Sequence, residues 1–173
     1  STSFLLSVNG IPGSNTAPVL ATPLSDQSTL EDAVFTFTVP ADTFIDVGDT
    51  LTYSATLADG NSLPAWLGFD GATGTFSGTP DNWDVGRLNV TVTATDSGGM
   101  ATSSSFALDV VNVNDAPMVV DAPADQEAIE GQPFSFAIPA GTFNDDDFIH
   151  GDSLTYSATL ADGTALPSWL SFD

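Results

Sequence analysis

The sequence predicts an all-β fold of tandem seven-stranded antiparallel Greek-key sandwiches, the second one truncated. Two observations carry this prediction. Apolar and polar residues alternate with a period of two in short runs, which are separated by turns rich in Gly and Pro, and this is the pattern of half-buried strands. The stretch "LTYSATLADG" occurs at residues 51–60 and again at 154–163, within a repeat of roughly 100 residues, the size of one domain.

The repeat divides the chain into three parts. Residues 17–70 return as residues 116–173 with their landmarks in the same order. We therefore expect a complete repeat at residues 17–115 and the N-terminal half of a following repeat at 116–173. Residues 1–16 are expected to be the last strand and linker of a preceding repeat, because residues 3–8 resemble the last strand of the complete one. The chain is thus predicted to be a fragment of a longer array.

Seven strands are expected in the complete repeat. In one of them, Leu88, Val90 and Val92 point to one face, and the Asn and Thr residues between them point to the other. No helical period competes, and Thr, Val, Phe and Tyr favour strands. The expected strands are residues 18–24, 35–39, 51–58, 66–69, 74–78, 88–95 and 106–110. Strands spaced in this way are typical of a sandwich of the immunoglobulin-like type.

Composition excludes several classes of function. One basic residue against 23 acidic ones gives a net charge of −22, so the chain cannot neutralise the phosphates of a nucleic acid, and anionic membrane surfaces repel it. No window is apolar and long enough for membrane insertion. Catalysis is not expected, because the chain has no lysine, no cysteine and no Ser beside a plausible His and Asp. The excess of carboxylate points to divalent cations, a saline environment, or both.

Acidic residues gather at one end of the complete repeat. Along a path of antiparallel strands the connections alternate between two ends, which brings several acids to the end from which the linker 112–115 leaves. These acids are Glu31, Asp32, Asp59, Asp81 and Asp84. The following repeat presents its acidic loop 144–152, "NDDDFIHGD", to the same end. Convergent carboxylates repel one another, and Ca²⁺, which takes roughly six to eight oxygen ligands, relieves that repulsion. One histidine and no cysteine serve zinc or copper poorly.

Four stretches carry a resemblance to known repeats. "VTVTATDSGG" at residues 90–99 and "FALDVVNVNDAP" at 106–117 are similar to the end of a cadherin repeat and its linker. "FDGATGTFSGTP" at 69–80 and "EGQPFSFAIP" at 130–139 resemble bacterial dystroglycan-type cadherin-like, or immunoglobulin-like, repeats of large secreted and surface proteins. The resemblance covers the whole chain. It implies an extracellular, non-catalytic module that binds calcium and acts in adhesion or as a calcium-stiffened spacer.

The resemblance also implies which residues hold the calcium. Cadherins use a glutamate after the first strand, acids before the sixth strand, the linker, and an Asp-x-Asp of the following repeat. Carried over by position, these are Glu31, Asp84 with Asp81 as second choice, Asn112, Asn114, Asp115, Asp145 and Asp147. A weaker second metal site is expected at the other end, formed by Asp46, Asp49 and Asp96. It is expected to be weaker because the upstream linker has Thr16 where Asp115 would stand.

Other functions and partners remain open at this point. One alternative is a carbohydrate-binding module of a secreted polysaccharide-degrading enzyme, in which Trp83 is the candidate platform for a sugar ring; Trp66 is expected to anchor the core instead. An enzyme in its own right ranks last. The expected partners are neighbouring repeats of the same array, polysaccharide, and another copy of the chain that donates its residues 3–8 to the truncated repeat. His150 is expected to be exposed, and Arg87 to pair with a nearby acid.

Overall fold

The computed structural model of the protein describes residues 15–173, which fall into two compact units. Unit 1 ends at Val113, and unit 2 runs from Asn114 to Asp173. The strand predicted at residues 3–8, and with it the predicted strand exchange, lies outside the described residues.

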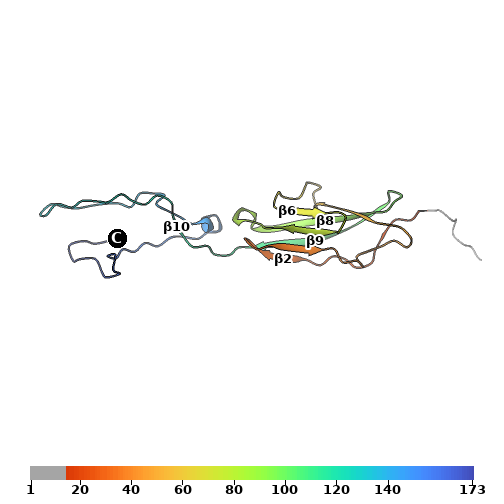
Figure 1. Cartoon of the computed structure of the whole chain (residues 1–173), viewed down its shortest axis with the longest axis horizontal. Coiled ribbons are helices and arrows are strands. Elements are labelled where there is room, and N and C mark those ends of the chain that lie inside the picture. Colours follow the sequence, from red (N-terminus) through yellow and green to blue (C-terminus); the bar gives the residue numbers. More distant parts are fainter. Residues whose placement is uncertain (1–14) are drawn as a thin grey trace, which may run out of the picture. The chain divides into compact units, whose positions relative to one another are not determined.

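The larger sheet of unit 1 has four strands in the spatial order β2-β9-β8-β5 (Figure 1). They are β2 (Gln27–Leu30), β5 (Thr52–Leu57), β8 (Gly86–Thr95) and β9 (Ala101–Val111). The long strands β8 and β9 form an antiparallel hairpin. On β8, Val90, Val92 and Ala94 are fully buried, whereas the Thr residues between them are partly exposed. This alternation was predicted from the sequence and is confirmed.

The smaller sheet of unit 1 has three antiparallel strands in the order β3-β7-β6. They are β3 (Phe35–Thr38), β6 (Leu67–Asp70) and β7 (Thr75–Gly78). A separate two-stranded sheet pairs β1 (Val19–Leu20) with β4 (Phe44–Ile45). A short 3-10 helix, η1 (Asn82–Asp84), connects β7 to β8. The two main sheets face each other, so the predicted sandwich is confirmed.

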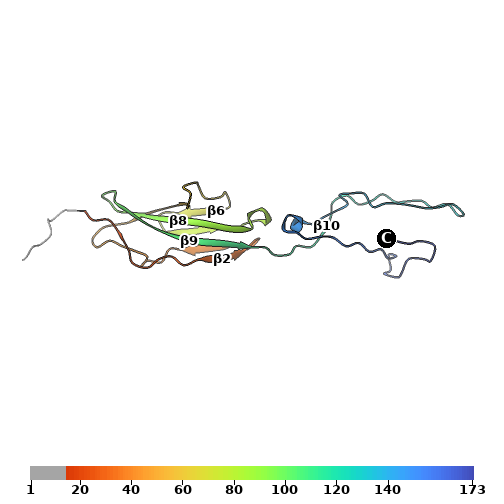
Figure 2. The ribbon, with the colours of Figure 1, turned by 180° about the vertical axis from the view of Figure 1, so that it is seen from behind.

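One strand pair departs from the predicted antiparallel order. β2 runs parallel to β9, with Gln27 opposite Leu108, and the two strands lie side by side in Figure 2. Of the strand predicted at residues 18–24, only Val19–Leu20 form a strand, β1, and a further strand, β2, follows this range and belongs to a different sheet. Pro23 lies between them, and a proline has no N–H to donate to a ladder. The N-terminal segment of the sandwich therefore passes from one sheet to another, whereas the predicted path of alternating antiparallel strands has no such crossing.

Aromatic rings fill the space between the two sheets. Phe76 of β7 is fully buried, and its ring centroid lies 4.5 Å from that of Phe69 and 5.6 Å from that of Phe106 on the opposite sheet. The buried core comprises Leu24, Phe35, Val39, Phe44, Leu67, Phe76, Val90, Val92, Ala94, Phe106 and Leu108. Aromatic pairs at such separations add about 0.5–1.5 kcal/mol beyond the burial of their area. Phe76 is thus the side chain that ties one sheet to the other.

Trp66 and Arg87 both have structural contacts. Trp66 is half-buried and packs against the core rather than being fully enclosed. A Cβ added at Gly78 would collide with the Trp66 carbonyl oxygen, so the turn that carries Trp66, just before β6, needs glycine beside it. Arg87, the chain's only lysine or arginine, pairs with Asp26 at 3.3 Å and with Asp109 at 3.2 Å, which confirms the predicted local ion pair. Both pairs are exposed and add little stability.

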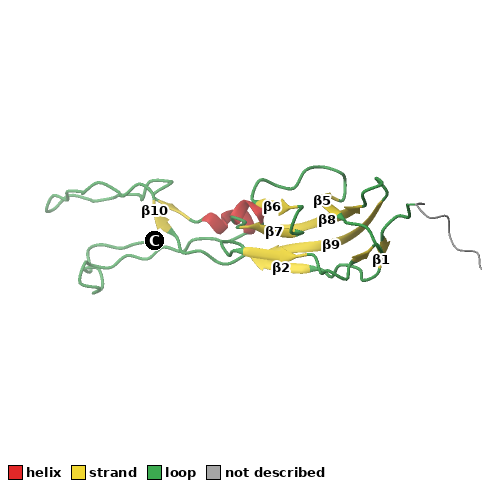
Figure 3. Ribbon diagram, turned by 45° about the vertical axis from the view of Figure 1, so that its right-hand side comes forward, coloured by secondary structure: helices red, strands yellow, loops and turns green. Residues whose placement is uncertain are grey.

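Unit 2 repeats part of the structure of unit 1. β10 (Met118–Val119) pairs with β11 (Phe143–Asn144) as β1 pairs with β4, and the 3-10 helix η2 (Asp146–His150) follows. Residues 155–160 have the sequence of β5 but form no strand, and Figure 3 shows unit 2 mostly as loop. Among residues 15–173, no helix has the length and apolar character needed to cross a membrane.

Candidate metal centre

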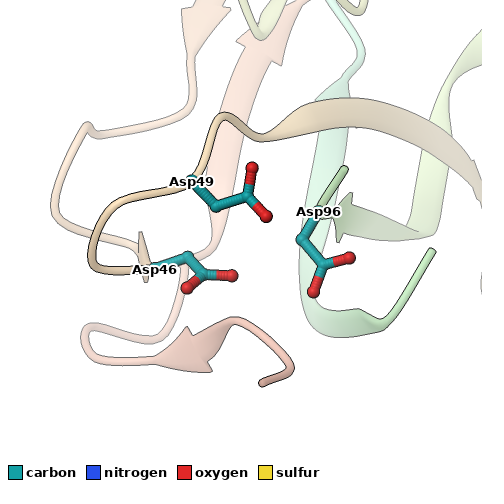
Figure 4. A group of neighbouring side chains, drawn as sticks. All are labelled: Asp46, Asp49 and Asp96. Carbon is teal, nitrogen blue, oxygen red and sulfur yellow. The ribbon is translucent and has the colours of Figure 1, made fainter. Parts of the chain in front are cut away.

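Three carboxylates of unit 1 converge on one point (Figure 4). Asp46 follows β4, Asp49 lies farther along the same loop before β5, and Asp96 follows β8. One oxygen from each of the three lies within 4.8 Å of the others. Asp96 is only 5% exposed, and the other two are half-buried. In the described part of the chain this is the one cluster of three or more acidic, histidine or cysteine ligands.

Hydrogen bonds hold two of the three carboxylates in place. Asp49 accepts from the Thr50 N–H at 2.7 Å and from the Ser97 hydroxyl at 2.8 Å. Asp96 accepts from the Met100 N–H at 2.8 Å through Oδ1. Because Ser97 lies in the β8–β9 turn and Asp49 in the β4–β5 loop, their bond ties the two loops together. The cluster is therefore built into the fold rather than formed by mobile side chains.

Asn15 completes the surroundings of Asp96. Its side-chain Nδ2 donates to Asp96 Oδ2 at 2.9 Å. A Cβ added at Gly98 would collide with the Asn15 amide, so the glycine in the β8–β9 turn makes room for it. Rotation of that amide by 180° would present its oxygen to the same space. Asn15 was not predicted as a ligand from the sequence, although it occupies in "NTAP" the place that Asn114 has in "NDAP".

The charges of this cluster perturb one another. Asp46 Oδ2 is buried and accepts no hydrogen bond from the described residues. Removal from water, and then repulsion by Asp49 and Asp96, raise the pKa of Asp46 above its ordinary value. The hydrogen bonds from Ser97 and Thr50 lower the pKa of Asp49. Asp46 is thus the carboxylate that lacks stabilisation, and a bound cation would supply it.

Glu31 and Asn112 both carry a buried oxygen at the end of unit 1 where the linker begins. Glu31 follows β2 and is 2% exposed. Its Oε1 accepts from the Val113 N–H, whereas its Oε2 accepts nothing from the described residues. The side-chain oxygen of Asn112 is also buried and accepts no hydrogen bond from the described residues. Burying such acceptors unsatisfied costs about 1–3 kcal/mol each, and more for a charged one, which a bound cation would offset.

Asp81 and Asp84 instead cap the N-terminal end of η1. Asp81 accepts from the Trp83 N–H at 2.9 Å, and Asp84 accepts from the Asp81 N–H at 3.0 Å. This reciprocal pair is a capping box, in which each side chain binds an otherwise unpaired N–H. Their position in "TPDNWDVG" is thus explained by the turn itself. Trp83, between them, is 79% exposed.

The predicted ligands of unit 2 are brought together within that unit. Asp145 is 3% exposed and Asp147 is 1% exposed. Asp145 accepts from the Asp147 N–H at 3.1 Å, and Asp147 accepts from the Asp115 N–H. Asn114 uses its amide to donate to the Asp115 carbonyl at 2.9 Å. Two nearly enclosed carboxylates therefore lie close together in unit 2.

Comparison with known families shows where the chain belongs. The putative Ig domain family matches residues 17–111 and 116–173, which is most of the chain, so the chain is a member of this family. These two matches coincide with the two repeats seen in the sequence. No curated protein matches the chain.

Several solved structures are similar to parts of the chain. Protocadherin Gamma B2 extracellular cadherin domains 1–5 match with a TM-score of 0.46 and 18% identity, over 75% of this chain and 26% of that one. Titin domain M7 matches with a TM-score of 0.36 and 22% identity, over 54% of this chain and 93% of the titin domain. An endo-fucoidan hydrolase from glycoside hydrolase family 107 matches with a TM-score of 0.45 and 27% identity, over 60% of this chain and 15% of the hydrolase. The chain thus spans a small part of the protocadherin and of the hydrolase.

Proposed function

We propose that the chain is a non-catalytic, calcium-binding immunoglobulin-like repeat of an extracellular multidomain protein, where it acts in adhesion or as a calcium-stiffened spacer. The convergence of Asp46, Asp49 and Asp96 within 4.8 Å carries the proposal. Three carboxylates at this distance repel one another, and a divalent cation turns the repulsion into attraction. From the sequence this group was expected to be the weaker site; its convergence is why we now propose it first.

Calcium is the cation that suits the donors. All of them are oxygens from carboxylates and, after rotation of its amide, Asn15; calcium prefers such hard ligands and accepts irregular geometry. Extracellular modules bind calcium with a Kd on the order of 0.1–1 mM. An ion held between the β4–β5 loop and the β8–β9 turn would also fix Asn15, the residue that leads into the repeat. This is how a cation would stiffen the entry to the module.

The proposal extends to two further groups, each within its own unit. In unit 1, Glu31 Oε2 and Asn112 Oδ1 are buried acceptors in need of a positive partner. In unit 2, Asp145 and Asp147 are nearly enclosed, and Asp115 is hydrogen-bonded to the second of them. Asp84 fits less well, because one of its oxygens already caps η1.

Calorimetric titration with CaCl₂ tests the proposal directly. Asp46→Asn removes the carboxylate that lacks hydrogen bonds on one oxygen, so we expect it to weaken binding at the Asp46–Asp49–Asp96 cluster at least about tenfold. Asp32→Asn is the matched control, because it removes one charge from an exposed position with φ 56°, a conformation that Asn tolerates. No heat of binding in the wild type, or equal binding by both variants, would refute the site.

A carbohydrate-binding module is the second candidate, and one observation favours it. Trp83 is 79% exposed on a turn that the capping box makes rigid, with two carboxylates beside it. An exposed indole offers a flat apolar surface for a sugar ring. Binding to insoluble neutral polysaccharides is the test, with Trp83→Ala against Asp32→Asn as control. Retention that depends on Trp83 and persists in chelator supports this role; absence of retention excludes it.

A further inference from the structure

The second repeat carries an apolar face that is covered in the first. Val39 is 7% exposed in unit 1, whereas Ile138, its counterpart in unit 2, is 37% exposed. Tyr156, Leu160 and Phe172 are also exposed, although their counterparts in unit 1 pack against the core. A hollow of about 680 Å³ opens in this face. Its apolar lining includes Phe134, Phe136, Ile138, Tyr156, Leu170 and Phe172.

Unit 1 shows which segments cover this face. Phe37 and Phe69, whose counterparts line the hollow, both contact Phe76 of β7, with ring centroids 6.2 and 4.5 Å away. Phe37 also contacts Phe106 of β9, at 5.3 Å. The hollow of unit 2 therefore corresponds to the space that rings from β7 and β9 fill in unit 1.

The strand next to this face is matched as well. In unit 1, β5 and β8 form an antiparallel ladder of six residue pairs, from Thr52 opposite Thr95 to Leu57 opposite Val90. Residues 155–160 have the same sequence as β5, Thr-Tyr-Ser-Ala-Thr-Leu. A strand with the sequence of β8 would therefore meet the same side chains in the same register.

A polar contact is matched too. Asp26 of unit 1 accepts from the Ala107 N–H at 2.8 Å and pairs with Arg87 at 3.3 Å. Its counterpart in unit 2 is Asp125, which is exposed. A β8–β9 hairpin thus finds the acceptor for its only cationic side chain on unit 2.

We propose that the apolar face of unit 2 is a docking surface for a three-stranded polypeptide segment with the sequence pattern of β7, β8 and β9. The rings at the positions of Phe76 and Phe106 enter the hollow, the β8-type strand pairs with residues 155–160, and the arginine binds Asp125. A single strand such as residues 3–8 resembles β9 alone, and it brings no ring to the place of Phe76. The docking surface does not depend on the proposed calcium sites.

The test extends the full chain after Asp173 by a second copy of its own residues 71–115. The copy is in register, because Asp173 is the counterpart of Asp70. Hydrogen exchange of residues 155–160 is followed by NMR and compared with that of residues 52–57 in the same molecule. The two segments have one sequence and thus one intrinsic exchange rate, so protection is read directly. The matched control carries Phe→Ser at both ring positions of the appended copy.

We expect the extension to slow exchange of residues 155–160 by at least about 100-fold, towards the rate of β5, and the control extension to leave it fast. Fast exchange in the extended chain, or equal slowing by the control, overturns the proposal. Protection of residues 155–160 in the unextended chain that increases with protein concentration also overturns it, since the occupant is then a second copy of unit 2.

Discussion

Replacing Asp96 with Asn should abolish the stabilisation that unit 1 gains from calcium at the Asp46–Asp49–Asp96 cluster. The Asp96 side chain is almost fully buried, and its oxygens accept from the Met100 N–H and from Asn15 Nδ2. Asn has the same shape, and its oxygen can still accept from Met100. What it removes is one of the three charges that face one another, together with the acceptor of Asn15. A cation at the cluster then keeps only Asp46 and Asp49.

The size of the effect follows from linkage. With a Kd on the order of 0.1–1 mM, calcium at roughly tenfold excess stabilises the folded unit by about 1.4 kcal/mol. In a domain of about 100 residues, 1 kcal/mol shifts Tm by about 4–8 °C, so wild-type unit 1 should gain about 6–11 °C. Asp96→Asn should gain about 1 °C or less. In chelator the variant should lose little stability, because the lost hydrogen bond is offset by the relief of repulsion.

Differential scanning calorimetry in 10 mM CaCl₂ and in chelator measures the shift. The concentration is chosen as about ten times the upper end of the expected Kd. Asp32→Asn, with the same change of charge at an exposed site, should keep the full calcium shift. A full shift in Asp96→Asn would show that calcium acts elsewhere. Loss of the shift in Asp32→Asn would show that it acts through net charge and not through the cluster.

The remaining predictions concern packing and pH. Phe76→Ala should cost about 3–5 kcal/mol in chemical denaturation, because the ring is fully buried between the sheets; a cost below about 1 kcal/mol would contradict the core. Trp66→Ala should cost about 2–3 kcal/mol, less than full burial implies, since the indole is half-buried; no cost would make it a surface residue. Gly78→Ala should cost about 1–3 kcal/mol through collision with the Trp66 carbonyl, and unchanged stability would disprove the close approach. The folded state raises the pKa of Asp46, so folding favours its protonated form. In chelator, the free energy of unfolding should therefore decrease as pH rises from the ordinary value of 3.8 through the raised pKa, because Asp46 becomes charged. Tm should therefore fall more over this range in the wild type than in Asp46→Asn, and parallel curves would contradict the repulsion.

The candidate site was predictable only in part. Each acid of the Asp46–Asp49–Asp96 cluster was selected from the sequence as a residue of a loop that faces one end of the module. From the sequence, this cluster was expected to be weaker than the site at the linker 112–115, because fewer linker carboxylates reach it. The structure adds two contacts that the number of carboxylates does not predict. Ser97 donates to Asp49 and so joins two loops, and Asn15 fits against the β8–β9 turn because Gly98 has no side chain.

Asp84 shows the opposite case. Its place before the sixth strand matched a ligand position by resemblance, yet its carboxylate binds the Asp81 N–H in the capping box of η1. The sequence contains both possibilities, because the same residue type serves as metal ligand and as helix cap. Which role prevails depends on whether a backbone N–H or other ligands lie within reach, and that is a property of the folded turn.

The sequence by itself determined the repeat, the strand period and the sandwich. Alternation and turn residues act over a few neighbours, so Val90, Val92 and Ala94 face the core wherever β8 pairs. The tertiary structure alone decided the parallel pairing of β2 with β9, the burial of Glu31 and the contact of Asn15 with Asp96. These contacts join residues 81 or 82 positions apart. Their energy is realised only after the loops between them close, so it depends on which sheet each strand joins and not on any local pattern.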